Sequence, residues 1–231
     1  MTFTPKYAIM KKEQRTGSIE IAVNLTFERG LEMSEVKSVE AVYVNGILYT
    51  RYPEGTPYPK RMVIKGDLDL CGTKITELPE GLEVEGYLDL GNTEITELPI
   101  GLKVGGDLDL RCTPVTELPK GLKVEGSLFL EGTEITELPE NLTVGENLDL
   151  RGTKITELPK SLTVGGDLYL QGTRITELPE SLTVGENLDL EGTKITELPK
   201  GLKVGGDLDL QGTGITKLPE DLVVGENIIG L

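Results

Sequence analysis

Carboxylates are the residues of this chain that could do chemistry, and they recur at a fixed interval. From residue 66 onward, aspartate recurs at two places in a series of eight twenty-residue copies, in six copies at one place and in four at the other. Tyr87, Phe129 and Tyr169 interrupt these rows. Alternate residues of a strand point to the same side, so these two places form neighbouring rows on one face. Carboxylates with aromatic side chains among them have the composition of a surface that docks a basic protein, because aromatic residues are enriched in interface hot spots.

We call this surface the strand face. Like charges stacked on neighbouring strands repel each other, and nothing in the sequence indicates that fold stability requires them, which favours a binding role. A purely solubilising role for the aspartates is the open alternative. The predicted partner-binding residues are Asp67, Asp69, Tyr87, Asp89, Asp107, Asp109, Phe129, Asp149, Tyr169, Asp189 and Asp209.

Catalysis is not expected from these residues. The chain has no histidine, which removes the commonest general base and every Ser-His or Cys-His pair. Gly105-Gly106 recurs in equivalent places as a corner, and it does not open a helix as a phosphate-binding loop does. Calcium and magnesium sites need oxygen ligands at spacings that the aspartate rows lack. We therefore expect no enzyme activity, no catalytic residue, no metal and no cofactor.

The aspartates are positioned by the repeat itself. Copies begin at residues 66, 86, 106, 126, 146, 166, 186 and 206, and a ninth begins at Glu226 and runs for six residues. Counting from the first residue of each copy, leucine fills positions three and five up to residue 225, and position ten is isoleucine or valine. Position seventeen is leucine and position nineteen is valine. A fixed period near twenty is typical of a solenoid, in which stacked units bury one continuous core.

Each copy is predicted to form one coil of three extended segments. The alternation in Leu-x-Leu and in Leu-x-Val is the period-two pattern of strands, and Ile-Thr-x-Leu-Pro supplies the segment between them. Proline at Pro79 and its equivalents indicates a turn or a strand edge, because it cannot donate to a ladder. Glycine near Gly72 and Gly86 is expected where the bends need a positive φ. The predicted fold class is mainly β, a right-handed solenoid with a small N-terminal cap.

The pattern Leu-x-Leu-x-x-Thr-x-Ile-Thr-x-Leu-Pro-x-x-Leu, as in Leu68–Leu82, resembles that of bacterial and phage leucine-rich-repeat proteins. The common leucine-rich unit has asparagine where this chain has Thr73 and its equivalents, and its leucines are spaced differently around the strand. Both a curved horseshoe and a straighter prism therefore stay open. The resemblance implies a protein-binding scaffold and assigns no role to individual residues.

Charge separates the two parts of the chain. Residues 1–65 hold ten of the 23 Lys/Arg and seven of the 39 Asp/Glu residues, so they carry +3 and residues 66–231 carry −19. An acidic rod is unsuited to direct nucleic-acid binding, which needs a basic face. It suits a basic protein partner, or imitation of a nucleic acid. The chain has no apolar run of membrane-spanning length, and its start lacks the apolar region of an export signal. With Cys71 and Cys112 too far apart for a disulfide, a cytoplasmic protein is expected.

The ends depart from the repeat. Residues 1–38 are predicted to cap the solenoid, and residues 66–225 form the eight full repeats. Residues 39–65 are open to two interpretations. Either they form a degenerate first coil, with Val42–Val44 in the place of Leu68–Leu70 and Met62–Ile64 as its last strand, or they form a capping hairpin that turns at Asn45-Gly46. The incomplete repeat 226–231 leaves an unpaired strand edge. Two ways to cover this edge stay open: the last residues fold over it as a small cap, or a second copy of the chain pairs with it as a homodimer.

These observations predict a non-enzymatic scaffold that binds a basic protein through the strand face. Two other functions remain open. One is an acidic nucleic-acid mimic that inhibits a DNA- or RNA-binding protein, and the other is a structural component of a bacterial or phage assembly.

Overall fold

The structure is a computed structural model that describes residues 18–22, 40–44, 47–51, 63–64 and 66–231. In this part of the chain the regular elements are all strands, without a helix. None of the described residues therefore belongs to a helix that could cross a membrane.

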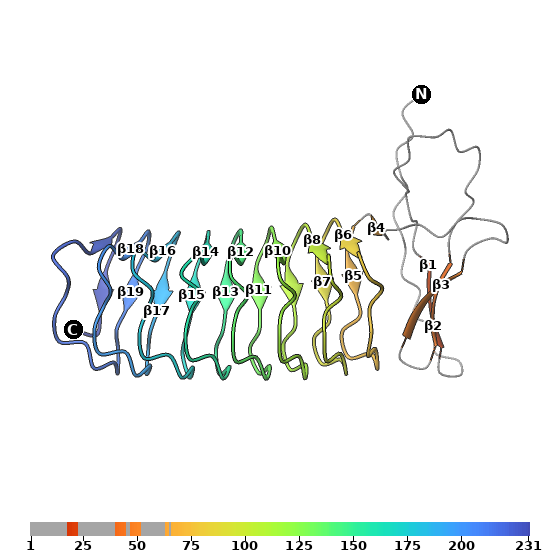
Figure 1. The fold of residues 1–231 in the computed structure, drawn as a ribbon, viewed down its shortest axis with the longest axis horizontal. Coiled ribbons are helices and arrows are strands. Elements are labelled where there is room, and N and C mark those ends of the chain that lie inside the picture. The colour runs from red at the N-terminus through yellow and green to blue at the C-terminus, as the bar shows by residue number, and fades with distance from the viewer. Residues whose placement is uncertain (1–17, 23–39, 45–46, 52–62, 65) are drawn as a thin grey trace, which may run out of the picture.

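The repeats stack as coils of a parallel β-solenoid, and each coil gives one strand to each of two nine-stranded sheets. Figure 1 shows the coils stacked into a straight rod, so the straighter of the two expected shapes is the one formed. The sheet that carries the strand face contains β5 (Leu68–Asp69), β7 (Leu88–Asp89), β9 (Leu108–Asp109), β11 (Leu128–Phe129), β13 (Leu148–Asp149), β15 (Leu168–Tyr169), β17 (Leu188–Asp189), β19 (Leu208–Asp209) and β21 (Ile228–Ile229). The other sheet contains β4 (Val63–Ile64), β6 (Glu83–Val84), β8 (Lys103–Val104), β10 (Lys123–Val124), β12 (Thr143–Val144), β14 (Thr163–Val164), β16 (Thr183–Val184), β18 (Lys203–Val204) and β20 (Val223–Val224).

Equivalent residues of successive coils are direct partners in both sheets. Leu128 pairs with Leu148 and Val124 pairs with Val144, each exactly one repeat away. The third extended segment of each coil forms no sheet, and single bonds such as the one from Lys154 N to Ile135 O, 3.1 Å, link its copies. Of the three predicted segments, Leu-x-Leu and Leu-x-Val thus form sheets, and Ile-Thr-x-Leu-Pro does not. The proline corner is a turn, as expected.

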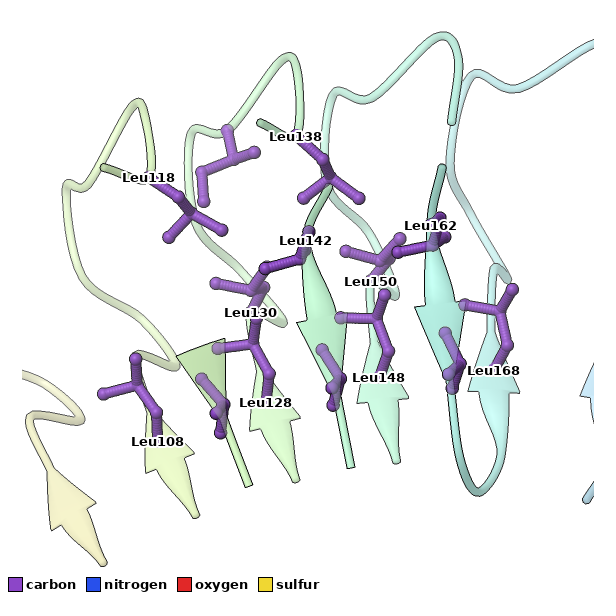
Figure 2. Close-up of a cluster of buried hydrophobic side chains, with 14 of the residues drawn as sticks. Leu108, Leu118, Leu128, Leu130, Leu138, Leu142, Leu148, Leu150, Leu162 and Leu168 are labelled. Atoms are coloured by element: carbon purple, nitrogen blue, oxygen red, sulfur yellow. The ribbon is translucent and has the colours of Figure 1, made fainter. Parts of the chain in front are cut away.

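The core lies between the two sheets and the third segment. The leucines of positions three and five are buried in every full coil, as are the position-ten residues and, up to residue 204, the leucine and valine of positions seventeen and nineteen. Figure 2 shows these leucines converging inside the rod from successive coils. The predicted core columns are confirmed. The threonine of position eight is held against this core: Thr153 is buried, and its Oγ1 donates to Leu150 O at 2.7 Å.

Two kinds of backbone constraint select glycine at the corners. Gly72 has φ +66°, as predicted, and Cys112 adopts φ +56° in the equivalent place. The expectation of a positive φ at Gly86 is wrong. Glycine is favoured there because a Cβ would lie 2.8 Å from the carbonyl carbon of Gly66 and 2.0 Å from Asp67 Oδ1. Close approach of coils, and not backbone handedness, explains this glycine.

The described N-terminal strands β1 (Ser18–Ala22), β2 (Glu40–Val44) and β3 (Ile47–Arg51) form a separate antiparallel sheet in the order β1-β2-β3. Within this sheet β2, which contains Val42–Val44, pairs antiparallel with both β1 and β3, and the two interpretations of residues 39–65 stay predictions. The Asn45-Gly46 turn lies outside the described residues, as does most of the predicted cap 1–38. Further on, β4 pairs in parallel with β6, so Val63–Ile64 does continue the solenoid strand. The domain boundaries stay a prediction.

Candidate functional site on the strand face

The aspartates of position four close a turn at the end of each strand. Asp109 Oδ1 accepts a hydrogen bond from the backbone N of Arg111, two residues on, at 2.9 Å. Asp and Asn side chains commonly make this local bond, which mimics a backbone turn. The same bond occurs at Asp69, Asp89, Asp149, Asp189 and Asp209. These carboxylates therefore have a structural role in closing turns, which the sequence analysis did not anticipate.

The side chains of position two bind the next coil. Asp167 Oδ1 accepts from Asn187 N at 2.9 Å and from Asn187 Nδ2 at 2.8 Å, and Asn187 Oδ1 accepts from Asp207 N at 2.7 Å. Asp207 continues the ladder to Asn227. Aspartate and asparagine alternate here from Asn147 onward, so a neutral amide separates each pair of charges. This row satisfies backbone N–H groups and holds the coils in register.

Two arginines, which sequence reasoning did not select, lie among the aspartates. Arg111 Nε donates to Asp109 Oδ2 at 2.9 Å, and Arg111 Nη2 lies 2.5 Å from the same oxygen. The guanidinium carbon lies 5.2 Å from the centre of the Phe129 ring, within the range of a cation–π contact. Asp109, Arg111 and Phe129 thus form one unit that spans two coils.

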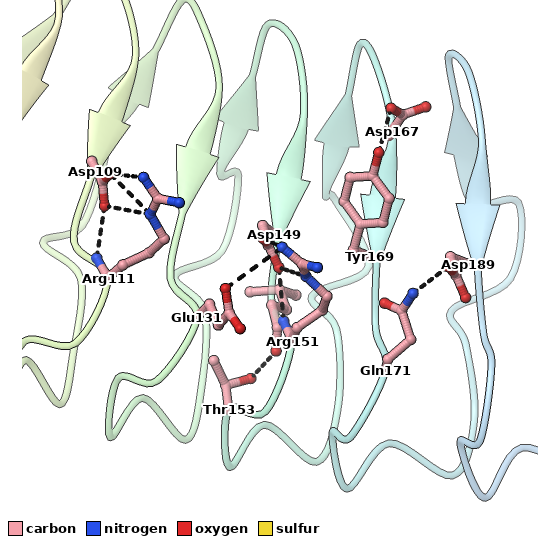
Figure 3. Close-up of polar contacts among 11 residues, drawn as sticks. Asp109, Arg111, Glu131, Asp149, Arg151, Thr153, Asp167, Tyr169, Gln171 and Asp189 are labelled. Atoms are coloured by element: carbon pink, nitrogen blue, oxygen red, sulfur yellow. Dashed lines mark hydrogen bonds and ion pairs between the residues drawn. The ribbon is translucent and has the colours of Figure 1, made fainter. Parts of the chain in front are cut away.

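A second unit with the same arrangement lies two coils further along. Arg151 donates to Asp149 through Nε at 2.9 Å and Nη2 at 2.6 Å, and its guanidinium carbon lies 5.5 Å from the centre of the Tyr169 ring. Figure 3 shows the Asp–Arg pair of the first unit and the whole of the second unit. Glu131 also reaches the second arginine, at 3.6 Å. Tyr169 Oη donates to Asp167 Oδ2 at 2.8 Å. Equivalent atoms of the two units are separated by about 9.6 Å, twice the spacing of parallel strands.

The eleven predicted partner-binding residues all lie on or beside the strands of this one sheet, but they differ in accessibility. Tyr87 is 41% exposed, whereas Asp149 is only 2% exposed. Asp149 therefore cannot contact a partner directly, and its role at this surface is to hold the side chain of Arg151 in place. Phe129 and Tyr169 are half-buried, so part of each ring stays accessible to solvent.

Two aspartates of position four that lie outside the arginine units, Asp89 and Asp189, have a raised pKa. Burial raises the pKa of Asp89, and the neighbouring carboxylates Asp109 and Asp69 raise it further. Burial likewise raises the pKa of Asp189, with a smaller contribution from Asp209. The backbone N–H of the turn opposes the shift in both cases. A cation placed near either carboxylate would therefore stabilise its ionised form.

The sequence did contain a signal for the arginines. Arginine occurs at position six of only two full copies, and in both cases the next copy has an aromatic residue at position four. Reading each row separately hid this relation, because the two partners belong to different rows and different coils. Comparing position six of each copy with position four of the next copy would have shown the two Arg–aromatic pairs.

Other features of the described residues are weaker candidates for a site. The end of the rod exposes side chains of columns that are buried in the coils before it: Leu218 is 38% exposed and Ile228 36%. Leu231 is 67% exposed. Cys71 and Cys112 are both exposed and unpaired with each other. A groove on the opposite sheet is lined by lysines, glutamates and glycines, among them Lys103, Lys123 and Glu125. This mixture of opposite charges is typical of an ordinary solvated surface.

Neither a scan against models of protein families nor a search of curated proteins finds a match to this chain.

Proposed function

We propose that this protein is an interaction scaffold that docks a protein partner, basic in character, through the strand face. The observation that supports this most directly is the pair of Asp–Arg–aromatic units at Asp109–Arg111–Phe129 and Asp149–Arg151–Tyr169. Arginine and tyrosine are the residue types that dominate interface energetics. Here each arginine is fixed by its aspartate on a rigid strand, which lowers the entropy that docking would cost.

Docking is favoured over imitation of a nucleic acid for a reason visible in the same units. A mimic needs an unbroken series of free carboxylates, whereas Asp109 and Asp149 are paired with arginines and Phe129 and Tyr169 replace the charge in two coils. Added DNA distinguishes the two functions, because it would release the target of a mimic and leave a docked protein bound.

The test is capture of partners from a bacterial lysate on the immobilised chain, beside the double variant Phe129→Asn/Tyr169→Asn. Asparagine at position four can close the same turn as the aspartates of the other coils, so this variant is designed to keep the fold. We expect a partner that the parent retains in the presence of DNA and that the variant loses. Equal capture by both proteins would contradict the proposal.

Assembly through the end of the rod is the second candidate function, and the exposed apolar side chains of the last coil favour it. A second copy of the chain would cover Leu218 and Ile228 and extend both sheets across the junction. Light scattering over a range of concentrations tests this. The parent is expected to dimerise at micromolar concentration and Ile228→Lys to stay monomeric. A monomeric parent would exclude this function.

A further inference from the structure

The strand face is divided into three zones along the rod. A central zone holds the two Asp–Arg–aromatic units, in which each arginine charge is balanced by its own carboxylate. On either side lies an acidic zone without an arginine. The first acidic zone contains Asp67, Asp69 and Asp89, and the second contains Asp189, Glu191 and Asp209.

The distance between the acidic zones sets the size of what the face can bind. Asp89 and Asp189 are five coils apart, which corresponds to roughly 24 Å along the rod. A partner that matches both zones must carry two cationic groups at about that separation, with uncharged side chains between them over Phe129 and Tyr169.

The backbone of the face narrows the choice of partner. Within the nine strands of this sheet, each interior strand is paired with neighbours on both sides. An extended peptide laid across the face would find no free strand edge, and its own N–H and C=O groups would stay unpaired. A helix satisfies its backbone internally and can lie across a sheet face through side chains alone.

Helix geometry also fits the spacing of the two units. Residues seven apart on a helix are separated by about 10.5 Å along its axis, close to the roughly 9.6 Å between the rings of Phe129 and Tyr169 expected from two coils. The separation of the acidic zones, about 24 Å, corresponds to about 16 helical residues.

Building on the proposed docking function, we propose that the strand face binds one amphipathic α-helix laid along the rod. The helix places apolar side chains over Phe129 and Tyr169 and presents lysine or arginine about 16 residues apart to the two acidic zones. The arginines of the central zone act as fixed walls beside the rings, and the acidic zones determine where along the rod the helix stops.

Two synthetic helical peptides of the same composition test this inference. The first has two lysines near each end, about 16 residues apart, with leucines spaced three, four and seven residues apart between them. The second has its lysines in the centre and its leucines at the ends. Fluorescence anisotropy should give at least tenfold tighter binding for the first peptide, and the preference should weaken as salt is raised. Equal affinity for the two peptides would overturn the proposal.

Variants of the chain separate this inference from the proposed function. Asp69→Asn/Asp89→Asn and Asp189→Asn/Asp209→Asn keep the turn acceptor and remove the charge, so either pair should lower affinity for the first peptide about tenfold without unfolding the rod. If both pairs leave binding unchanged, the helix placement is wrong. A lysate partner that is lost from Phe129→Asn/Tyr169→Asn but kept by both charge variants would retain the docking function and reject the helix. A partner indifferent to all of these variants would reject the docking function itself.

Discussion

Asp149 is 2% exposed and receives two side-chain hydrogen bonds from Arg151, at 2.9 and 2.6 Å, in addition to the bond from the Arg151 backbone. A carboxylate this deeply buried needs its cation, because a charge left without a partner in a poorly solvated place is costly. The equivalent Asp109 is paired in the same way with Arg111, but its side chain is 13% exposed against 3% for Asp149. The two units therefore form a matched pair that differs in the burial of the carboxylate.

Removing the second arginine should cost more stability than removing the first. We expect Arg151→Ala to lower the free energy of unfolding by about 2 kcal/mol, because a charged hydrogen-bond partner is lost. Arg111→Ala should cost about 1 kcal/mol or less, as exposed ion pairs do. Urea unfolding followed by circular dichroism measures both. Equal losses would show that burial of Asp149 does not set the strength of its pair.

Asp89→Asn should stabilise the chain at neutral pH. Burial raises the pKa of Asp89, so the folded state holds a proton more tightly than the unfolded state does. The ionised form is then the unfavourable one, and stability falls as pH rises from the unfolded pKa through the raised folded pKa. Asparagine removes the charge and keeps an oxygen to accept the bond from Gly91 N.

The comparison with the parent checks the sign of this effect. Thermal unfolding should show a higher Tm for Asp89→Asn at pH 7, and the difference should disappear near pH 3, where the parent carboxyl is neutral in both states. Asp189→Asn is expected to behave in the same way, since burial also raises the pKa of Asp189. A difference that is independent of pH would mean that the amide acts through packing and not through charge.

The outline of the fold could be predicted from the sequence because it depends on columns of identical residues. Leu128 and Leu148 occupy the same place in successive copies, and stacking them in parallel is the direct way to bury both. The role of the aspartates could not be predicted in this way. Asp109 accepts the turn bond from Arg111 N at Oδ1 and bonds from the Arg111 side chain at both oxygens. All of these bonds depend on where the strand ends. A period of twenty locates the column but does not specify which N–H groups the strand leaves unpaired.

Cys112→Gly should stabilise the chain. Cys112 has φ +56°, a conformation that costs a residue with a side chain roughly 1 kcal/mol and that glycine adopts freely. The expected net gain is about 0.5 kcal/mol, because glycine relieves the strain but loses more conformational freedom on folding. The reverse change at Gly152, φ +67°, is the matched control, because a Cβ there would meet no other atom within 4 Å. Gly152→Ala should therefore lose about 1 kcal/mol from backbone strain alone. Chemical denaturation of the two variants measures both, and a loss at Cys112→Gly would mean that the thiol packs favourably.

Tyr169→Phe should change how stability depends on alkaline pH. Burial, followed by the hydrogen bond to Asp167, raises the pKa of Tyr169 to about 12. An unfolded tyrosine ionises near pH ~10, so between about pH 10 and 12 the unfolded state loses its proton first and the folded state is destabilised. Phenylalanine cannot ionise, so the stability of the variant should fall less steeply over this range.

At pH 8 the variant Tyr169→Phe should be less stable than the parent by about 1 kcal/mol, because it loses the hydrogen bond from the hydroxyl to Asp167 Oδ2. The stability difference should therefore shrink as pH rises from 10 towards 12, as measured by urea unfolding at each pH. Tyr87→Phe is the comparison: Tyr87 is 41% exposed, and its replacement should change stability at pH 8 by less than about 0.5 kcal/mol. A constant difference between parent and Tyr169→Phe over the whole range would show that the phenol of Tyr169 titrates as in the unfolded chain. In that case the hydroxyl would not be held by Asp167 in solution, and the ring would be free to turn towards a partner.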